Sequence, residues 1–135
     1  MKARAPAALD APLLLRHHAR ANRIIRSATF EGLGDANGQV LTAPMITLYR
    51  ALLDGGVRTL VTGFMAVSAE GRAVQPGQCA LHSSSHAAAW RTALTTLRSD
   101  FVDATYSAQL AHCGRQTLRR VTGHPTAESI RQRAG

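Results

Sequence analysis

Apolar and polar positions recur along this chain at two spacings, one typical of strands and the other typical of helices. Residues 22–30 and 57–67 are rich in β-branched side chains, which favour strands. Residues 101–106 alternate apolar and polar side chains, the pattern of a strand with one buried face. The sequence therefore predicts three strands with a long segment between each pair.

Each of the two intervening segments is predicted to contain an amphipathic helix. The first should begin at Thr42 as its N-cap, with Pro44 in its first turn, and end at the glycine pair 55–56. Its apolar positions are Met45, Leu48, Tyr49, Leu52 and Leu53. The second should be capped by Ser84 or Ser85. Its apolar side carries Ala89, Trp90, Ala93, Leu94 and Leu97, which we interpret as core positions and not as a cofactor site.

Strands that alternate with single helices indicate right-handed βαβ crossovers and a parallel sheet. Glycine-containing loops are predicted at residues 31–38 and 68–82. A parallel sheet needs cover on both faces, and its outer strands would present unpaired backbone groups. Three strands and two helices therefore predict the first part of a larger α/β fold.

The segment after the third predicted strand has the densest collection of reactive side chains. Residues 107–116 read S-A-Q-L-A-H-C-G-R-Q, which brings amide, imidazole, thiol and guanidinium groups together. The carboxyl ends of parallel strands form the open mouth where α/β proteins place their binding and catalytic groups. We therefore expect functional side chains at this end of the sheet.

Length and composition fit one globular domain. The chain has 135 residues, of which 45% are hydrophobic and 18% charged, and no apolar run reaches the roughly 20 residues of a membrane span. Asp10 and Pro12 interrupt the apolar stretch near the start, so we expect no signal peptide. Cys79 and Cys113 form no disulfide framework, which favours the cytoplasm.

The formal net charge of +8 comes from sixteen basic residues spread along the whole chain. A nucleic-acid-binding protein concentrates such residues on one face and interleaves aromatic side chains, of which this chain has six. We therefore predict no specific nucleic-acid partner and no membrane partner. The charge by itself supports only weak, salt-sensitive binding to polyanions.

Three stretches together resemble one known family. The first is N-R-I-I at residues 22–25, followed by S-A-T at 27–29. The second runs from Tyr49 through G-G-V at 55–57 to L-V-T-G at 60–63, followed by Val67 and by G-R at 71–72. The third, Q-L-A-H-C-G-R at 109–115, is similar to a Q-L-x-H-x-G-R signature. In this order and spacing they resemble the Old Yellow Enzyme family of FMN-containing NADH:flavin oxidoreductases and ene-reductases.

The resemblance implies a TIM (β/α)8 barrel, of which this chain would supply about the first three βα units. Residues 23–117 would be a partial flavin-binding barrel, between an irregular lead-in at 1–22 and a basic tail at 118–135. The implied FMN contacts are Ser27, Ala28, Thr29, Gly63, Phe64 and Gln109. The first three would lie against the flavin ring and ribityl chain, and the next two would bring backbone close to the ring. The Gln109 amide would hydrogen-bond the pyrimidine end of the isoalloxazine.

In a complete relative, NAD(P)H reduces FMN, and the reduced flavin passes hydride to an activated alkene or related small-molecule acceptor. The family's carbonyl-binding pair, its proton-donating Tyr and its phosphate-binding loop lie beyond the region that the resemblance covers. We therefore expect no catalytic residue in this chain, little activity from the fragment alone, and a complementary chain as a candidate source of the remaining barrel.

Two substitutions depart from the family pattern. Phe30 stands where many relatives carry a Thr or Cys that hydrogen-bonds the flavin, and a phenyl ring makes no such bond. Arg58 replaces a small residue and would place a charge beside the second strand.

Arg72 and Arg115 each follow a glycine just past a strand end. We interpret these two either as solvated loop residues or as charges facing the cofactor.

The residues alone also leave two alternatives to a flavoprotein. Cys79, His82 and His86 have a spacing that suits a metal, with His112 or Cys113 as a fourth ligand. No Glu accompanies the histidines as in a metalloprotease helix, so we favour a helix-capping, solvent-facing role for them and predict no metal site. The other alternative is a non-catalytic remnant or basic interaction module without a cofactor.

Overall fold

The computed structural model describes residues 8–72 and 76–114. Its strands are β1 (Leu13–Leu15), β2 (His18–Arg20), β3 (Ile25–Arg26), β4 (Thr59–Val61), β5 (Met65–Ala66), β6 (Thr105–Ser107) and β7 (Leu110–Ala111). Its helices are α1 (Thr42–Asp54) and α2 (Ser84–Asp100). One helix therefore lies between each pair of sequential strands of the central sheet.

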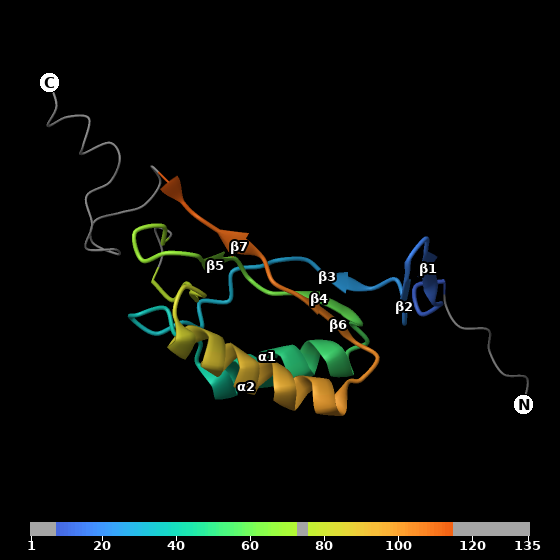
Figure 1. The fold of residues 1–135 in the computed structure, drawn as a ribbon. Helices are drawn as coiled ribbons and strands as arrows, with labels where there is room; N and C mark the ends of the chain where they lie inside the picture. The colour runs from blue at the N-terminus through green and yellow to red at the C-terminus, as the bar shows by residue number, and fades with distance from the viewer. Residues whose placement is uncertain (1–7, 73–75, 115–135) are drawn as a thin grey trace, which may run out of the picture.

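The central sheet is parallel and has the strand order β3-β4-β6. Ile25 lies opposite Thr59, which in turn lies opposite Thr105. All three strands run in one direction, and both helices return on the same face of the sheet (Figure 1). This arrangement confirms the predicted alternation of parallel strands and crossover helices, because successive right-handed crossovers place their helices on one side.

The second and third strands are each interrupted and then continue. Residues 57–67 were predicted as one strand, but β4 and β5 are separated by residues 62–64, and β7 likewise follows β6 after a gap. The distal strands β5 and β7 pair with each other in parallel. The third strand also begins later than predicted, at Thr105, because α2 extends to Asp100 with Phe101 as its C-cap.

The first strand is much shorter than the predicted residues 22–30, since only Ile25–Arg26 joins the ladder. Beyond it, the carbonyls of Ser27 and Thr29 accept hydrogen bonds from side chains. The lead-in also differs from its prediction as irregular, because β1 and β2 form an antiparallel hairpin. This hairpin lies at the end of the sheet from which the strands begin (Figure 1).

The core lies between the central sheet and the two helices. Leu60 of β4 is fully buried there, together with Met45, Tyr49 and Leu53 of α1 and Trp90 and Leu97 of α2. Leu94 is partly buried against the same cluster, so the interpretation of the α2 positions as core is confirmed. Truncation of one such buried leucine to alanine typically costs about 2–5 kcal/mol.

Both predicted N-caps are displaced by one residue or more. The N-cap of α1 is Leu41, which offers no side-chain hydrogen bond, so the prediction of Thr42 was wrong. Ser83 caps α2 in place of Ser84 or Ser85, because its hydroxyl accepts a hydrogen bond from the His86 backbone N at 3.2 Å. That register puts His86 in the first turn with its ring facing inward.

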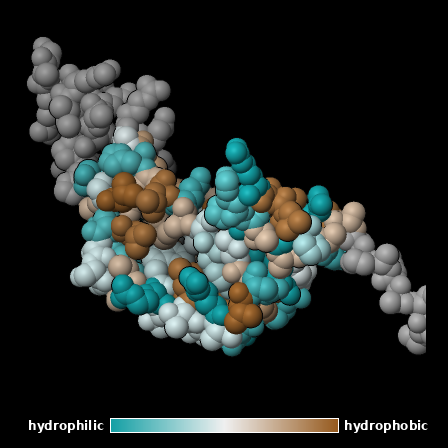
Figure 2. All heavy atoms as spheres, turned by 45° about the vertical axis from the view of Figure 1, so that its right-hand side comes forward, coloured by the Kyte–Doolittle hydropathy of each residue, from teal (hydrophilic) through white to brown (hydrophobic). Residues whose placement is uncertain are grey.

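The other face of the central sheet carries no helix of the described residues (Figure 1). Leu60 points to the helices, so by alternation the row of Ile25, Thr59 and Thr105 points away from them. Ile25 is 58% exposed in consequence. Figure 2 shows exposed apolar side chains in several separate patches, with hydrophilic side chains between them. Within the described part of the chain, neither helix has the length and apolar character needed to cross a membrane.

Candidate functional site

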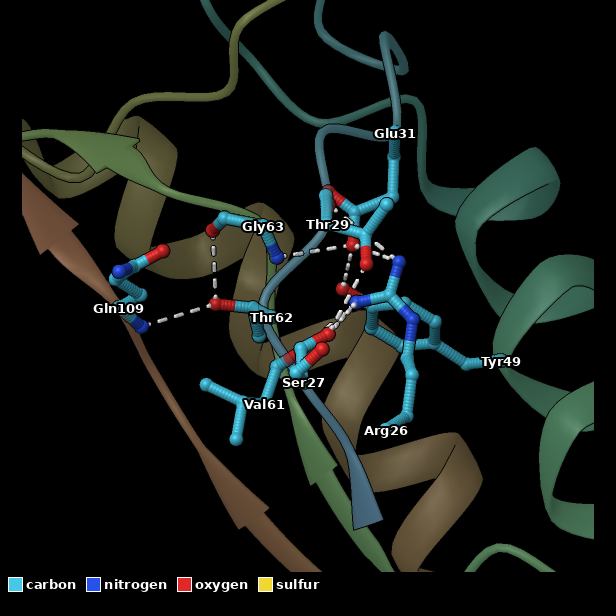
Figure 3. A network of polar contacts seen from close by, with 9 residues as sticks. All are labelled: Arg26, Ser27, Thr29, Glu31, Tyr49, Val61, Thr62, Gly63 and Gln109. Atoms are coloured by element: carbon cyan, nitrogen blue, oxygen red, sulfur yellow. Dashed lines mark hydrogen bonds and ion pairs between the residues drawn. The ribbon is translucent and has the colours of Figure 1, made fainter.

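The carboxyl ends of the three central strands meet at one edge of the sheet, where a network of polar contacts connects them (Figure 3). At its centre is Glu31, whose side chain is only 5% exposed. One carboxylate oxygen, Oε1, accepts hydrogen bonds from the Tyr49 hydroxyl at 2.7 Å and from the Gly63 backbone N at 2.9 Å. Glu31 therefore joins the end of the second strand to helix α1.

Arg26 supplies the opposite charge to Glu31. Its Nη2 lies 3.0 Å from Glu31 Oε1, and its side chain is 12% exposed. The same guanidinium donates to the Val61 carbonyl at 2.9 Å and, more weakly, to the carbonyls of Ser27 and Thr29, both at 3.4 Å. A buried carboxylate is tolerated only when it is paired and hydrogen-bonded, and these contacts satisfy that requirement.

Tyr49 closes the network from the helix side. Its pKa lies far above the ordinary tyrosine value, first because the ring is buried, and then because its hydroxyl donates to the negative Glu31. The guanidinium of Arg26, 5.6 Å from the centre of the Tyr49 ring, acts in the opposite direction. Tyr49 therefore remains a protonated hydrogen-bond donor throughout the physiological pH range.

Gly63 has no room for a side chain. A Cβ atom at this position would lie 2.6 Å from the Thr29 carbonyl oxygen and would collide with the Glu31 carboxylate. The glycine is thus required by close approach of two chain segments. Its contact with Thr29 brings residues 27–29 and the end of β4 together.

Gln109 reaches the same edge from the third strand. Its backbone N donates to the Thr62 hydroxyl at 3.3 Å, and its carbonyl accepts from the Met65 backbone N at 2.8 Å. The Gln109 residue is exposed, and no hydrogen bond to another described residue occupies its side-chain amide. The backbone is therefore held in place while the amide is available to a ligand.

The remaining expected contacts also gather at this edge. Ser27 and Thr29 are exposed, and Ala28 is half-buried. Phe64 stacks at a tilt on Phe30, with 5.6 Å between the ring centres. Phe30 therefore contributes an aromatic surface at the position where the resemblance implies a hydrogen-bonding Thr or Cys.

The network that holds the edge together has no signature in the sequence. Glu31 was assigned to a loop, Arg26 to a strand and Tyr49 to the helix core. No local motif connects them, because Glu31 lies 18 positions before Tyr49 and 32 before Gly63. The available signal was a carboxylate directly after the S-A-T-F segment, in a chain with only eight acidic residues.

The candidate metal ligands Cys79, His82 and His86 do not form a metal site within the described residues. No cluster of three or more His, Cys, Asp or Glu side chains suited to a metal occurs within residues 8–72 and 76–114. His82 is exposed, but His86 is buried, so the expectation that it faces solvent was wrong. The Cys79 thiol is buried, which raises its pKa to about 12.

The arginines singled out in the sequence have different environments. Arg58 does lie beside the second strand, where it pairs with Asp103 at 3.0 Å and donates to the Leu53 carbonyl near the end of α1. Arg72 is buried, so a solvated loop role is wrong for it. Arg115 lies outside the described residues.

No protein-family model and no curated protein matches this chain. Solved structures do match it. The old yellow enzyme homologue of Zymomonas mobilis is 19% identical, with a TM-score of 0.72, and the match covers 89% of this chain and 32% of that one. The old yellow enzyme from Trypanosoma cruzi is 17% identical, with a TM-score of 0.74, and the match covers 91% of this chain and 32% of that one. Morphinone reductase in complex with tetrahydroNAD is 16% identical, with a TM-score of 0.71, and the match covers 90% of this chain and 32% of that one.

This chain thus spans about a third of the length of these enzymes. At such identities the likeness is one of fold, and it confirms the expected architecture. The parallel strands with both helices on one face form an arc of a TIM barrel, with the network around Glu31 at the carboxyl ends of its strands. The chain therefore has the fold of about three βα units of a (β/α)8 barrel of the old yellow enzyme type.

Proposed function

We propose that this edge of the sheet contacts the flavin of an FMN-dependent oxidoreductase of the NADH:flavin type, as one part of a larger barrel. The observation that carries the proposal is the position of Gly63. Its backbone is held by Glu31 against residues 27–29, at the end of the sheet where α/β barrels bind their ligands. The fold likeness to old yellow enzymes supports the same assignment.

The residues present fit a flavin. An isoalloxazine ring is flat and has donors and acceptors at its edge, so it needs exposed backbone without bulky side chains and an amide that can both donate and accept. Ser27 and Thr29 offer exposed positions with small side chains and Gln109 offers the amide, whereas Gly63 is itself buried against Glu31 and Thr29. The aromatic pair Phe30 and Phe64 adds an apolar surface beside them.

In this proposal, the bound FMN accepts hydride from NAD(P)H and donates it to an activated alkene or related small molecule. The residues of this chain bind and orient the ring: the Ser27 to Thr29 segment lies against it, and the Gln109 amide holds its pyrimidine end. None of them is assigned a catalytic role. We further propose a cytoplasmic location, because Cys79 and Cys113 are both free thiols.

We also propose that additional strands complete the sheet beyond β3 and β6, whether from the same polypeptide or from a complementary chain. Neither outer strand has a further partner among the described residues. Such edges, and the uncovered sheet face, are expected to require cover in a stable barrel.

The proposal is tested by titrating FMN with the full chain and following the quenching of flavin fluorescence. We expect saturable quenching that the substitution Gln109→Leu weakens, because the amide that holds the ring edge is removed. Gln39→Leu, which alters a glutamine outside the edge, is the matched control and should leave the titration unchanged. Equal weakening by both substitutions, or no saturable quenching by the parent chain, would overturn the assignment.

A further inference from the structure

A pocket lies at the amino-terminal end of α2, and none of its residues belongs to the proposed flavin site. Its volume is about 360 Å³. It is lined by Arg72, by His82, Ser83 and His86 around the start of the helix, and by Ala69 and residues 36–37. The polar side chains among these are basic or neutral, so the lining as a whole favours a negatively charged occupant.

Arg72 is the principal charge of this pocket. The residue is only 7% exposed, and its guanidinium donates to the Ala36 carbonyl at 2.6 Å and weakly to the Gln78 carbonyl at 3.5 Å. Its Nε atom is buried and has no hydrogen-bond partner. None of the ion pairs formed within residues 8–72 and 76–114 includes it. A buried cation without a counter-charge is costly, and a bound anion would remove that cost.

His86 provides an independent indication. It is 5% exposed, lines the pocket, and has a buried Nδ1 atom with no hydrogen-bond partner. The ring of His82 lies perpendicular to it, with 4.6 Å between the ring centres. Two buried side chains from different segments of the chain therefore line one pocket, and each contains a nitrogen atom without a hydrogen-bond partner.

The helix contributes to the same site. Helix α2 has 17 residues, so its first turn concentrates a partial positive charge and backbone N–H groups without intrahelical partners. The Ser83 hydroxyl satisfies only the His86 N–H. Against the larger effect of burial, a backbone hydrogen bond with Asn37 and the charge of Asp35 act on His86 to raise its pKa. The Oδ1 atom of Asp35 is already bonded to the backbone N atoms of Asn37 and Gln39, both at 2.8 Å.

We propose that this pocket binds a small oxyanion or phosphoryl group between Arg72, His86 and the first turn of α2. The guanidinium and the helix N–H groups supply hydrogen-bond donors, and a bound anion would favour the protonated form of the His86 imidazole, whose pKa burial lowers and in which both ring nitrogens donate. The site is separate from the flavin-contacting residues and does not depend on the flavin assignment.

The test follows backbone amide and histidine ring resonances of the full chain by NMR during titration with inorganic phosphate, with ionic strength held constant by chloride. We expect saturable shifts at Ser84, Ser85 and the His86 ring. The variant Arg72→Gln should weaken binding by at least about tenfold, since a charge-assisted hydrogen bond is lost. Arg91→Gln, which removes an exposed arginine from the same helix, is the control and should not change the affinity.

If Arg72→Gln does not fold, His86→Gln in the same titration provides the second test, with a weakening of several-fold expected. Non-saturable shifts spread over exposed arginines, or equal losses in the Arg91 and Arg72 variants, would overturn the proposal. A parallel titration with a nucleoside diphosphate distinguishes the source of the group. Tighter binding than inorganic phosphate indicates a phosphorylated small molecule and equal binding a free oxyanion, and either result supports the site.

Discussion

The Tyr49 hydroxyl donates to the Glu31 carboxylate at 2.7 Å, and this bond connects the fully buried core of α1 to the carboxyl edge of the sheet. Because the same carboxylate oxygen accepts from the Gly63 N–H, the packing of the helix determines where the proposed flavin-contacting backbone lies. The core and the candidate site are therefore mechanically coupled through one side chain.

The substitution Tyr49→Phe removes this bond and leaves the ring in the core. Glu31 retains Arg26 and Gly63, so we expect a moderate loss of about 1–2 kcal/mol in the free energy of unfolding. Urea denaturation followed by circular dichroism measures it. An unchanged unfolding midpoint would show that the hydroxyl does not couple the helix to the edge.

The substitution Glu31→Gln should be more damaging, because it leaves Arg26 buried without its counter-charge. Removal of one partner of a buried pair typically costs about 3–5 kcal/mol. The matched control is Asp103→Asn, whose ion pair with Arg58 is more exposed and should contribute less than about 1 kcal/mol. Similar losses in both variants, measured by urea denaturation, would contradict the role given to Glu31.

The substitution Gly63→Ala tests the close approach at the end of β4. The added Cβ would lie 2.6 Å from the Thr29 carbonyl oxygen, so residues 27–29 must move away. We expect a loss of about 1–3 kcal/mol together with changed amide resonances across residues 27–31. Gly55→Ala, where the nearest atom would be 3.3 Å away, should leave those resonances in place.

Alkaline pH should destabilise the chain through Cys79. Burial, and then the negative charges of Glu31 and Asp35, raise the pKa of its thiol to about 12 in the folded state from 9.0. The unfolded state therefore releases the thiol proton first. The contribution of this thiol to the free energy of unfolding is fully present below pH 9 and declines as the pH rises toward 12. The variant Cys79→Ala should reduce this decline in unfolding experiments between pH 8 and 12. An identical slope in both proteins would contradict the assignment of that thiol.

The spacing of apolar residues predicted both helices and their alternation with parallel strands, because burial against a sheet requires a continuous apolar side. It did not predict that the first strand ends at Arg26. There, the Arg26 guanidinium donates hydrogen bonds to the carbonyls of Ser27 and Thr29. These side-chain bonds take the place of hydrogen bonds to a neighbouring strand, and they depend on tertiary contacts. The N-cap of α2 was misplaced because three adjacent serines could have served, and that of α1 because the helix begins after Leu41 without any side-chain cap.

The candidate site was predictable only in part. Resemblance placed Gly63 and Gln109 at the strand ends, where the structure has them. The residues that hold this edge, Arg26, Glu31 and Tyr49, come from a strand, a loop and a helix, and only the folded chain brings them together. Long-range pairs of this kind leave no periodic signal in a single sequence.

The central claim is that the edge around Gly63 contacts a flavin, and amide NMR of the full chain with FMN tests it most directly. We expect chemical-shift changes confined to residues 27–29, 63–64 and 109. Adenosine monophosphate, which has a phosphate but no isoalloxazine, should produce none at these positions. The absence of such changes at millimolar FMN, or identical changes with both compounds, would contradict it.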